Sequence, residues 1–278
     1  MCYKYIMKNK LALGIVALIV IVGILLFTSS NRSTEPEENM ELETSQDTNS
    51  NLVKQEAMFE VTSSDVTYFD DVTGYYSEPA EEGEFPGVVM IHEWWGLNEN
   101  IKDMADELAG QGYRVLAVDL FGTVATTPDE ARAQTQALDT EIALQNMTAA
   151  KEYLNNQGST KVASLGWCFG GGQSLQMSLN NEVDATVIYY GSLVTDPAEL
   201  IKLNSPVLGI FGSEDTSIPV ETVNEFEETL NELEYQNDIN IYEGVGHAFA
   251  NPSGANYAPE ETMDAWAKTL SFLETNLK

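Results

Sequence analysis

A cysteine between two glycines is the first candidate for chemistry in this chain. Residues 162–172 run from a strand-like stretch into Gly166-Trp167-Cys168-Phe169-Gly170, and a helix-like stretch follows. In a sharp strand-to-helix turn, glycines two positions either side of the cysteine avoid collisions that larger side chains would cause. The first amides of the following helix favour both a thiolate and an oxyanion. Most buried cysteines are inert, so Cys168 alone does not establish catalysis.

Two later segments supply the partners that a nucleophile needs. Asp215 follows an apolar stretch at residues 207–212, and His247, in a glycine-rich loop, is the only histidine after Cys168. A nucleophile, an acid and a histidine in this order, each after a strand, form a catalytic triad. The histidine would take the thiol proton and later donate it to the leaving oxygen, while the acid orients the imidazole. Glu214 is the alternative acid; Asp215 is preferred because its side chain is shorter and it precedes the turn into a helix.

Strand and helix patterns alternate from residue 87 to the C-terminus, which predicts a mostly parallel central sheet with helices on both faces. A hairpin of residues 66–69 and 73–77 precedes them. The expected strands are residues 87–91, 113–119, 161–166, 185–190, 207–212 and 239–242. The expected helices are residues 98–110, 128–155 (one helix or two), 171–179, 196–203, 219–233 and 259–276. With the strand–turn–helix pattern around the cysteine, they predict the α/β-hydrolase fold.

Four motifs together resemble the dienelactone hydrolase family. They are Gly-Trp-Cys-Phe-Gly-Gly at residues 166–171, Gly-Ser-Glu-Asp at 212–215, Gly-His-Ala-Phe at 246–249 and His-Glu-Trp-Trp-Gly-Leu at 92–97. The resemblance covers about residues 66–278. It implies a single-domain, cofactor-free hydrolase whose partner is a small ester or lactone, cleaved through an acyl-cysteine. Two histidines and two cysteines are also too few ligands for a His/Cys metal site.

The fold and the resemblance assign further roles around the cysteine. The fold predicts an oxyanion hole made by the backbone amides of Phe169 and Trp94. The resemblance implies that Glu93 lies beside the thiol and takes part in its activation. A carboxylate there could hold the thiol protonated until substrate binds. Trp94 and Trp95 would either pack in the core or line the pocket, and Phe249 would add apolar surface to it.

One feature departs from the family. Its members that hydrolyse dienelactones bind a substrate carboxylate with two arginines. This chain has Asn251 where one is expected, and Arg132 corresponds only loosely to the other. Of the formal net charge of −31, residues 59–278 hold −29. These observations predict a neutral ester or lactone as substrate, and the acidity argues against nucleic acid as a partner.

The first 58 residues predict a membrane anchor followed by a tether. Residues 1–10 carry three lysines and no acid, residues 11–27 are apolar, and residues 28–58 are polar and acidic. This pattern predicts an uncleaved signal anchor that places the domain outside the cytoplasm. The alternative is a signal peptide whose cleavage would release the domain. The linker has too few aliphatic residues to fold, so residues 59–278 form the catalytic domain, which is expected to be monomeric.

Two other functions fit the same predicted fold. A non-catalytic surface-binding domain would have a broken triad, whereas all three groups are present here. A peptidase on this fold usually carries a serine nucleophile with an added propeller or large lid, and the sequence contains neither. The sequence therefore favours hydrolysis of esters or lactones, without naming the substrate.

Overall fold

The computed structural model describes residues 56–278. The predicted cytoplasmic segment and membrane span, and all but the last residues of the predicted linker, lie outside the described residues. Within the described part, no helix combines the length and the apolar character needed to cross a bilayer. The signal anchor and the cleaved signal peptide therefore both stay predictions.

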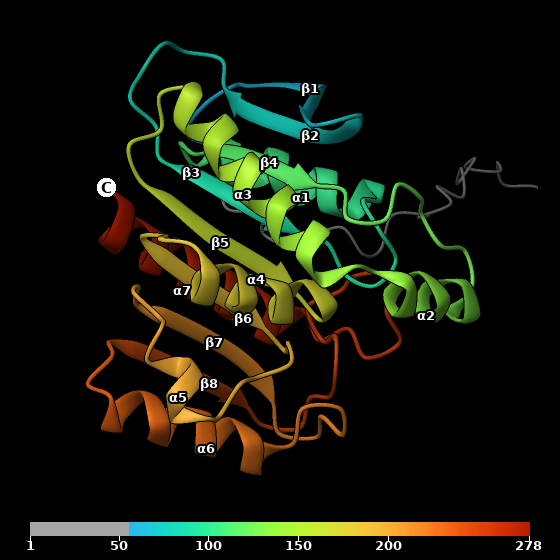
Figure 1. The fold of residues 1–278 in the computed structure, drawn as a ribbon, viewed down its shortest axis with the longest axis vertical. Coiled ribbons are helices and arrows are strands. Elements are labelled where there is room, and N and C mark those ends of the chain that lie inside the picture. Colours follow the sequence, from blue (N-terminus) through green and yellow to red (C-terminus); the bar gives the residue numbers. More distant parts are fainter. Residues whose placement is uncertain (1–55) are drawn as a thin grey trace, which may run out of the picture. The chain divides into compact units, whose positions relative to one another are not determined.

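In the described chain, eight strands form one sheet in the order β1-β2-β4-β3-β5-β6-β7-β8 (Figure 1). The strands are β1 (Val61–Phe69), β2 (Val72–Pro79), β3 (Gly87–Ile91), β4 (Arg114–Val118), β5 (Val162–Trp167), β6 (Ala185–Tyr189), β7 (Val207–Gly212) and β8 (Asn237–Tyr242). β2 pairs antiparallel with β1 and β4, and all pairings from β4 across to β8 are parallel. Because parallel strands end at the same edge, the loops that follow them are brought together.

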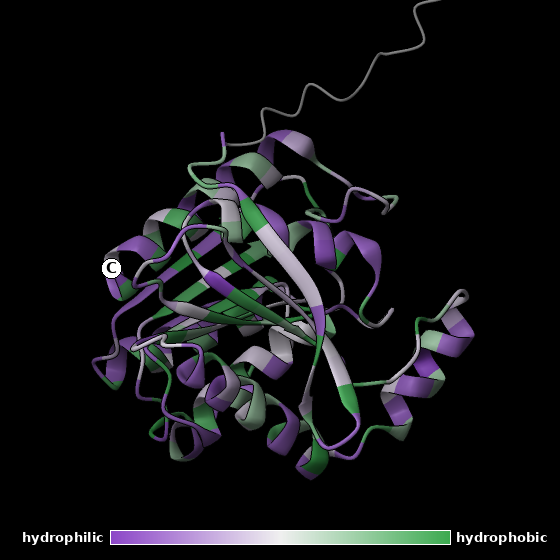
Figure 2. Cartoon of the chain, turned by 90° about the horizontal axis from the view of Figure 1, so that it is seen from above, coloured by the Kyte–Doolittle hydropathy of each residue, from purple (hydrophilic) through white to green (hydrophobic). Residues whose placement is uncertain are grey.

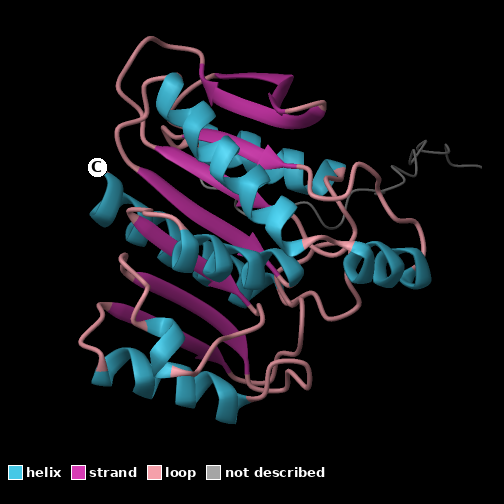
Figure 3. Cartoon of the chain, in the orientation of Figure 1, coloured by secondary structure: helices cyan, strands magenta, loops and turns pink. Residues whose placement is uncertain are grey.

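Helices cover both faces of the sheet, as the alternating pattern predicts (Figures 1 and 3). They are α1 (Glu99–Gly110), α2 (Pro128–Ala137), α3 (Thr140–Asn156), α4 (Phe169–Asn180), α5 (Pro197–Leu200), α6 (Val220–Glu232) and α7 (Pro259–Leu277). α1 and α7 pack on one face, and α3, α4 and α6 pack on the other. α2 projects beyond the layers, and most of its residues are exposed.

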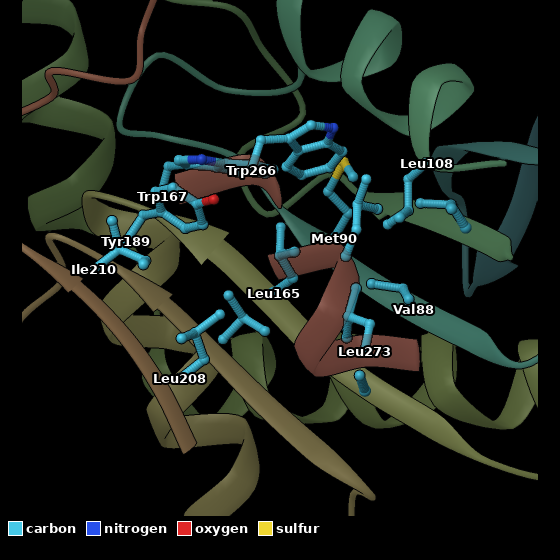
Figure 4. Packing of buried hydrophobic residues seen from close by; sticks show 14 of the residues in the cluster. Val88, Met90, Leu108, Leu165, Trp167, Tyr189, Leu208, Ile210, Trp266 and Leu273 are labelled. Carbon is cyan, nitrogen blue, oxygen red and sulfur yellow. The ribbon is translucent and has the colours of Figure 1, made fainter. Parts of the chain in front are cut away.

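The core explains why β3 is a continuous apolar run, and why the one polar side chain of β5, Ser164, is hydrogen-bonded. Every residue of these two central strands is buried. Along β3, Val88 and Met90 face the cluster that includes Trp266 of α7 (Figure 4). Val89 and Ile91 face the cluster under α3. Successive strand residues point to opposite faces, so a strand covered on both sides needs an apolar residue at each position. Figure 2 shows the hydrophobic colour on these inner strands and hydrophilic residues on the outer helices.

The observed helix and strand boundaries decide two of the expectations from the sequence. The predicted helical stretch at residues 128–155 is two helices, because Leu138 and Asp139 adopt extended backbone between them. The Asp139 side chain accepts hydrogen bonds from the amides of Glu141 and Ile142 and so begins α3. The predicted hairpin is confirmed as the inner part of the longer β1–β2 pair.

The turn between β5 and α4 brings backbones too close together for side chains. A Cβ atom on Gly166 would lie 2.1 Å from the carbonyl oxygen of Gly170, and one on Gly170 would lie 2.2 Å from that of Ile91. Backbone atoms cannot move aside as a flexible side chain can, so these positions require glycine. The glycine spacing in the sequence is thus a steric requirement for bringing α4 against β3.

We predict that Gly170→Ala prevents stable folding or lowers the free energy of unfolding by more than about 3 kcal/mol. Gly170 lies in a helix, where alanine is otherwise favoured by about 1 kcal/mol, so any loss reports the backbone collision. Gly172→Ala in the same helix is the control, because its nearest neighbours would lie at 3.3–3.5 Å. Urea unfolding of both variants measures the difference, and equal stability would contradict the steric explanation.

Candidate active site

Cys168 stands at the apex of the turn between β5 and α4. Its backbone has φ 54° and ψ −115°, a strained combination for a residue with a side chain. Its amide donates a hydrogen bond of 2.9 Å to the carbonyl of Tyr189 at the end of β6. The residue is partly exposed, so its thiol is accessible from outside the core. The strained turn therefore places the sulfur at the carboxyl edge of the sheet.

His247 links the cysteine to an aspartate. Its Nε2 lies 3.1 Å from the sulfur of Cys168, and its Nδ1 lies 2.8 Å from Oδ2 of Asp215. The other oxygen of Asp215 accepts hydrogen bonds from the amides of Ser217 and Ile218, which fix the carboxylate. The three side chains that the sequence places in order along the chain thus lie in one continuous hydrogen-bonded row.

The loop after β7 determines which acid reaches the histidine. Asp215 is buried, whereas its neighbour Glu214 is exposed and makes no side-chain contact with His247 among the described residues. The amide of Glu214 donates to the carbonyl of Val245, which ties this loop to the one that carries His247. The preference for Asp215 over Glu214 agrees with this geometry.

Hydrogen bonds and charges within this row shift the pKa values of His247 and Asp215. Burial alone would lower the pKa of His247, but the hydrogen bonds and charges of Asp215 and Cys168 outweigh it and raise that pKa to about 10. Burial acts to raise the pKa of Asp215, and the hydrogen bond from His247 with two backbone amides brings it below its usual value. At neutral pH, an imidazolium therefore donates one proton towards Asp215 and the other towards the sulfur.

Glu93 lies in a buried environment on the loop after β3. Burial raises its pKa to about 7, against the opposing effects of a hydrogen bond from Asn251 and the charge of His247. Nδ2 of Asn251 donates to Oε2 of Glu93, and Oδ1 of Asn251 accepts from Ser253. Asn251, expected among the substrate contacts, thus binds a protein carboxylate instead.

His92 holds this loop in place. The ring is fully buried, its Nδ1 donates to the carbonyl of Glu93, and its Nε2 accepts from the amide of Leu120. Burial lowers the pKa of His92, so the ring is neutral in this role. The predicted oxyanion amides of Phe169 and Trp94 make no hydrogen bond within the described chain, and they remain available to a ligand.

The aromatic residues that were predicted to line the pocket differ in how deeply they are buried. Trp94 and Trp95 are partly exposed and pack edge to face, with centroids 5.1 Å apart, on the loop beside the cysteine. Phe249 is fully buried and packs against Tyr190 and Tyr242, so the expectation that it lines the pocket is wrong. The reason is that its ring points into the core beneath the histidine loop.

Arg132 is the last of the predicted substrate contacts, on a helix whose Gln134 side chain donates a hydrogen bond to the carbonyl of Trp94. It lies on the exposed α2, its side chain is 58% exposed, and it pairs with Asp129 one turn earlier. In the described part of the chain, no hydrogen bond or ion pair joins it to the cysteine, the histidine or Glu93. Its predicted role in binding substrate stays a prediction that the geometry of the free protein does not support.

A cavity and a tyrosine beside His247 were not predicted from the sequence. The cavity, of about 420 Å³, is lined by Glu214, Thr216, Asn256, Tyr257 and the loop that carries His247. Tyr190 packs its ring edge against His247, with centroids 5.4 Å apart. The only sequence signal for Tyr190 is its place at the end of the strand expected at residues 185–190, although β6 itself ends at Tyr189. Within the described residues, no cluster of three or more acids, histidines or cysteines could hold a metal ion.

Comparisons with known proteins agree with this arrangement. The model of the dienelactone hydrolase family matches residues 72–277. Proteins named "Putative carboxymethylenebutenolidase" from Saccharolobus solfataricus and Salmonella typhimurium are each 30% identical, over 67% and 73% of this chain and 88% and 82% of theirs. A crystal structure titled "Putative Dienelactone Hydrolase" from Klebsiella pneumoniae aligns with a TM-score of 0.72 at 24% identity, covering 77% of this chain and 98% of that one. This structural likeness shows a common α/β-hydrolase fold.

We predict that Glu93→Gln changes how stability depends on pH. The pKa of about 7 in the folded state exceeds the usual glutamate value of 4.5, so the folded state binds more protons between these values. This contribution to stability is complete below pH 4.5 and is lost as the pH rises through about 7. Relative to Glu93→Gln, the wild type should lose on the order of 1–3 kcal/mol of unfolding free energy across that window.

The control for this prediction is Glu214→Gln, which removes an exposed acid from the neighbouring loop. Urea unfolding at pH 4.5, 6 and 8 gives the free energies of all three proteins. A constant difference between wild type and Glu93→Gln would mean that the Glu93 carboxyl group does not titrate in this window.

Proposed function

The chain belongs to the dienelactone hydrolase family, and we propose that it hydrolyses small neutral esters or lactones through an acyl-cysteine intermediate. The observation that carries this proposal is the position of His247, within hydrogen-bonding distance of both the Cys168 sulfur and the Asp215 carboxylate. This is the geometry that nucleophilic acyl transfer requires. The carboxymethylenebutenolidase relatives support a lactone or ester as the class of substrate.

The first half of the reaction forms a thioester. The Cys168 thiolate attacks the carbonyl carbon, and the carbonyl electrons move to oxygen, where the amides of Phe169 and Trp94 stabilise the negative charge. The carbonyl re-forms as the bond to the leaving oxygen breaks. The imidazolium of His247 donates its Nε2 proton to that oxygen, so an alcohol leaves, or in a lactone the ring opens.

The second half releases the acid. His247, now neutral, accepts a proton from water as the water oxygen attacks the thioester carbonyl. The tetrahedral intermediate then expels the thiolate, which restores the thiolate–imidazolium pair and leaves a carboxylic acid. Asp215 keeps the imidazole in one orientation throughout, and the charge of His247 in turn favours the ionised form of Glu93. The polar cavity beside His247 gives water and the leaving alcohol a place to enter and depart.

The two other functions have less support. A non-catalytic binding domain would not need to retain a cysteine, a histidine and an aspartate in hydrogen-bonding geometry. A peptidase of this fold would be expected to carry an additional domain, and the described residues form one α/β unit. Neither alternative is favoured by a specific observation.

We predict that Cys168→Ala lowers kcat for a neutral aryl ester by roughly a thousandfold or more, because no acyl-enzyme can form. Cys168→Ser should retain little activity, because the site is arranged for a thiolate, which a serine hydroxyl group does not supply. Steady-state kinetics and circular dichroism together separate lost chemistry from lost fold. Retention of full activity by a folded Cys168→Ala would refute the acyl-cysteine mechanism.

We also predict that neutral lactones are hydrolysed faster than carboxylated analogues. Asn251 is occupied by Glu93, Arg132 pairs with Asp129, and residues 59–278 hold a net charge of −29. A missing charge-assisted contact with the substrate carboxylate lowers affinity about ten- to a hundredfold. The measurement is kcat/KM for a matched neutral and anionic pair at low and high salt. A preference for the anion at both salt concentrations would require a basic group in the site.

A further inference from the structure

A row of hydrogen bonds connects the β1–β2 hairpin with the buried ring of His92. The hydroxyl group of Tyr68 donates to Oδ1 of Asn146 over 2.6 Å, and Nδ2 of Asn146 donates to the carbonyl of Asp119 over 3.0 Å. The same peptide group carries the amide of Leu120, which donates to Nε2 of His92 over 3.2 Å. Every donor in this row therefore points the same way, towards the histidine.

The two ring nitrogens of His92 have opposite roles. The amide of Leu120 can only donate, so Nε2 must accept, and the carbonyl oxygen of Glu93, 2.7 Å from Nδ1, can only accept, so Nδ1 must carry the hydrogen. One neutral tautomer meets both requirements in this fully buried position. The ring thus accepts a hydrogen bond from one loop and donates one to the next in the same direction.

The row ends at the amide of Trp94. This N–H and the carbonyl of Glu93 belong to one planar peptide group, so the bond from His92 fixes the direction of the N–H and polarises it. The Glu93 carbonyl also accepts from the amide of Gly96 at 3.2 Å, and the carbonyl of Trp94 accepts from Nε2 of Gln134 at 2.6 Å. Both peptide groups that flank the Cα atom of Trp94 are therefore held from the carbonyl side.

His92 also contacts the segment that supplies the other predicted oxyanion amide. Its ring stacks on that of Phe169, with centroids 6.1 Å apart and planes 20° from parallel. Its carbonyl oxygen lies so close to the elbow that a Cβ atom on Gly170 would be 2.5 Å from it. His92 therefore touches both backbone segments that would bind the substrate oxygen.

We propose that His92 is a positioning residue for the oxyanion hole, and that Asn146 and Tyr68 behind it complete a row of hydrogen bonds that orients and polarises the amide of Trp94. The inference rests on the proposed hydrolase function. Negative charge collects on the carbonyl oxygen only as the tetrahedral intermediate forms, so an amide fixed in advance stabilises that state more than the bound substrate. Each donation along the row makes the last N–H a stronger donor to that charge.

The first test compares His92→Leu with His92→Asn. Leucine removes both hydrogen bonds, whereas asparagine can place Nδ2 near the position of the histidine Nδ1 and keep the donation to Glu93. We expect His92→Leu to lower kcat for a neutral aryl ester about 10- to 100-fold with little change in KM, and His92→Asn to recover most of that loss. Both variants leave the amide of Leu120 without its acceptor and should lower Tm, so a difference in kcat between them reports the donor.

The second test removes the remote end of the row. Tyr68→Phe deletes one hydroxyl group, and Tyr76→Phe is the matched control in the same hairpin, because its hydroxyl group donates to Glu78 over 2.8 Å outside the row. Both should lower Tm. Tyr68→Phe should lower kcat about two- to threefold, and Tyr76→Phe should leave it unchanged. Equal kcat values in these two variants would overturn polarisation along the row.

A trifluoromethyl ketone tests the oxyanion hole without turnover. The Cys168 thiolate adds to the carbonyl carbon and the carbonyl electrons move to the oxygen, which stays in the site as an oxyanion because there is no leaving group. Fluorine NMR titration should show that affinity for the ketone falls about 10- to 100-fold in His92→Leu and recovers in His92→Asn. The corresponding trifluoromethyl alcohol forms no oxyanion and should bind all three proteins equally.

These measurements separate the two proposals. If no ester or lactone is hydrolysed, the proposed function fails, and the ketone affinities still decide the role of His92. Should His92→Leu fail to fold, Tyr68→Phe and its control Tyr76→Phe make the same comparison with the ketone. An equal loss of kcat in His92→Leu and His92→Asn, one ketone affinity for all variants, or no ketone adduct in the wild type would each overturn the inference.

Discussion

The close approach of three backbones at the elbow is the constraint on which the site depends. Gly166 and Gly170 let the start of α4 pack on β5 and β3, and the turn between them forces Cys168 to positive φ. A chain of buried hydroxyl groups ties α4 to the strands below it. Its members are Ser164, Ser174, Ser178, Thr186 and Ser205. These hydrogen bonds and the core around them stabilise the strained turn, which no local interaction would maintain.

Two buried carboxyl groups near one histidine have different protonation behaviour. Asp215 accepts hydrogen bonds from two amides and an imidazole, and its pKa lies below the usual value. Glu93 receives a single hydrogen bond from a neutral amide, and burial raises its pKa to about 7. Groups whose environments separate their pKa values in this way can take different roles at one pH. The fixed charge on Asp215 orients the imidazole, whereas Glu93 can change its charge during turnover.

Local patterns in the sequence predict the strands and the elbow, because each depends on spacing within a short segment, and the fold then gives the order of the three groups of the proposed triad. They do not predict contacts between distant segments. Asn251 and Glu93 are 158 residues apart, and their pairing depends on how two loops meet at the sheet edge. Phe249 follows the histidine in a loop, where no alternation rule indicates which side chains point inward. The positive φ of Tyr190 and the packing of its ring against His247 depend on several elements at once.

The placement of the arginines bears on how this member of the family can select a substrate. Of the two arginines in the described residues, Arg114 begins β4 and binds Glu78, so it lies at the sheet edge opposite the site. Arg132 is paired on the exposed α2. The buried amide of Asn251 cannot bind an anion while it donates to Glu93, and an approaching carboxylate would have to compete with that protein carboxylate. Both guanidinium groups of the described residues are therefore paired. Under the proposed function, the substrate is then selected by its shape and polarity beside Trp94, Trp95 and the polar cavity.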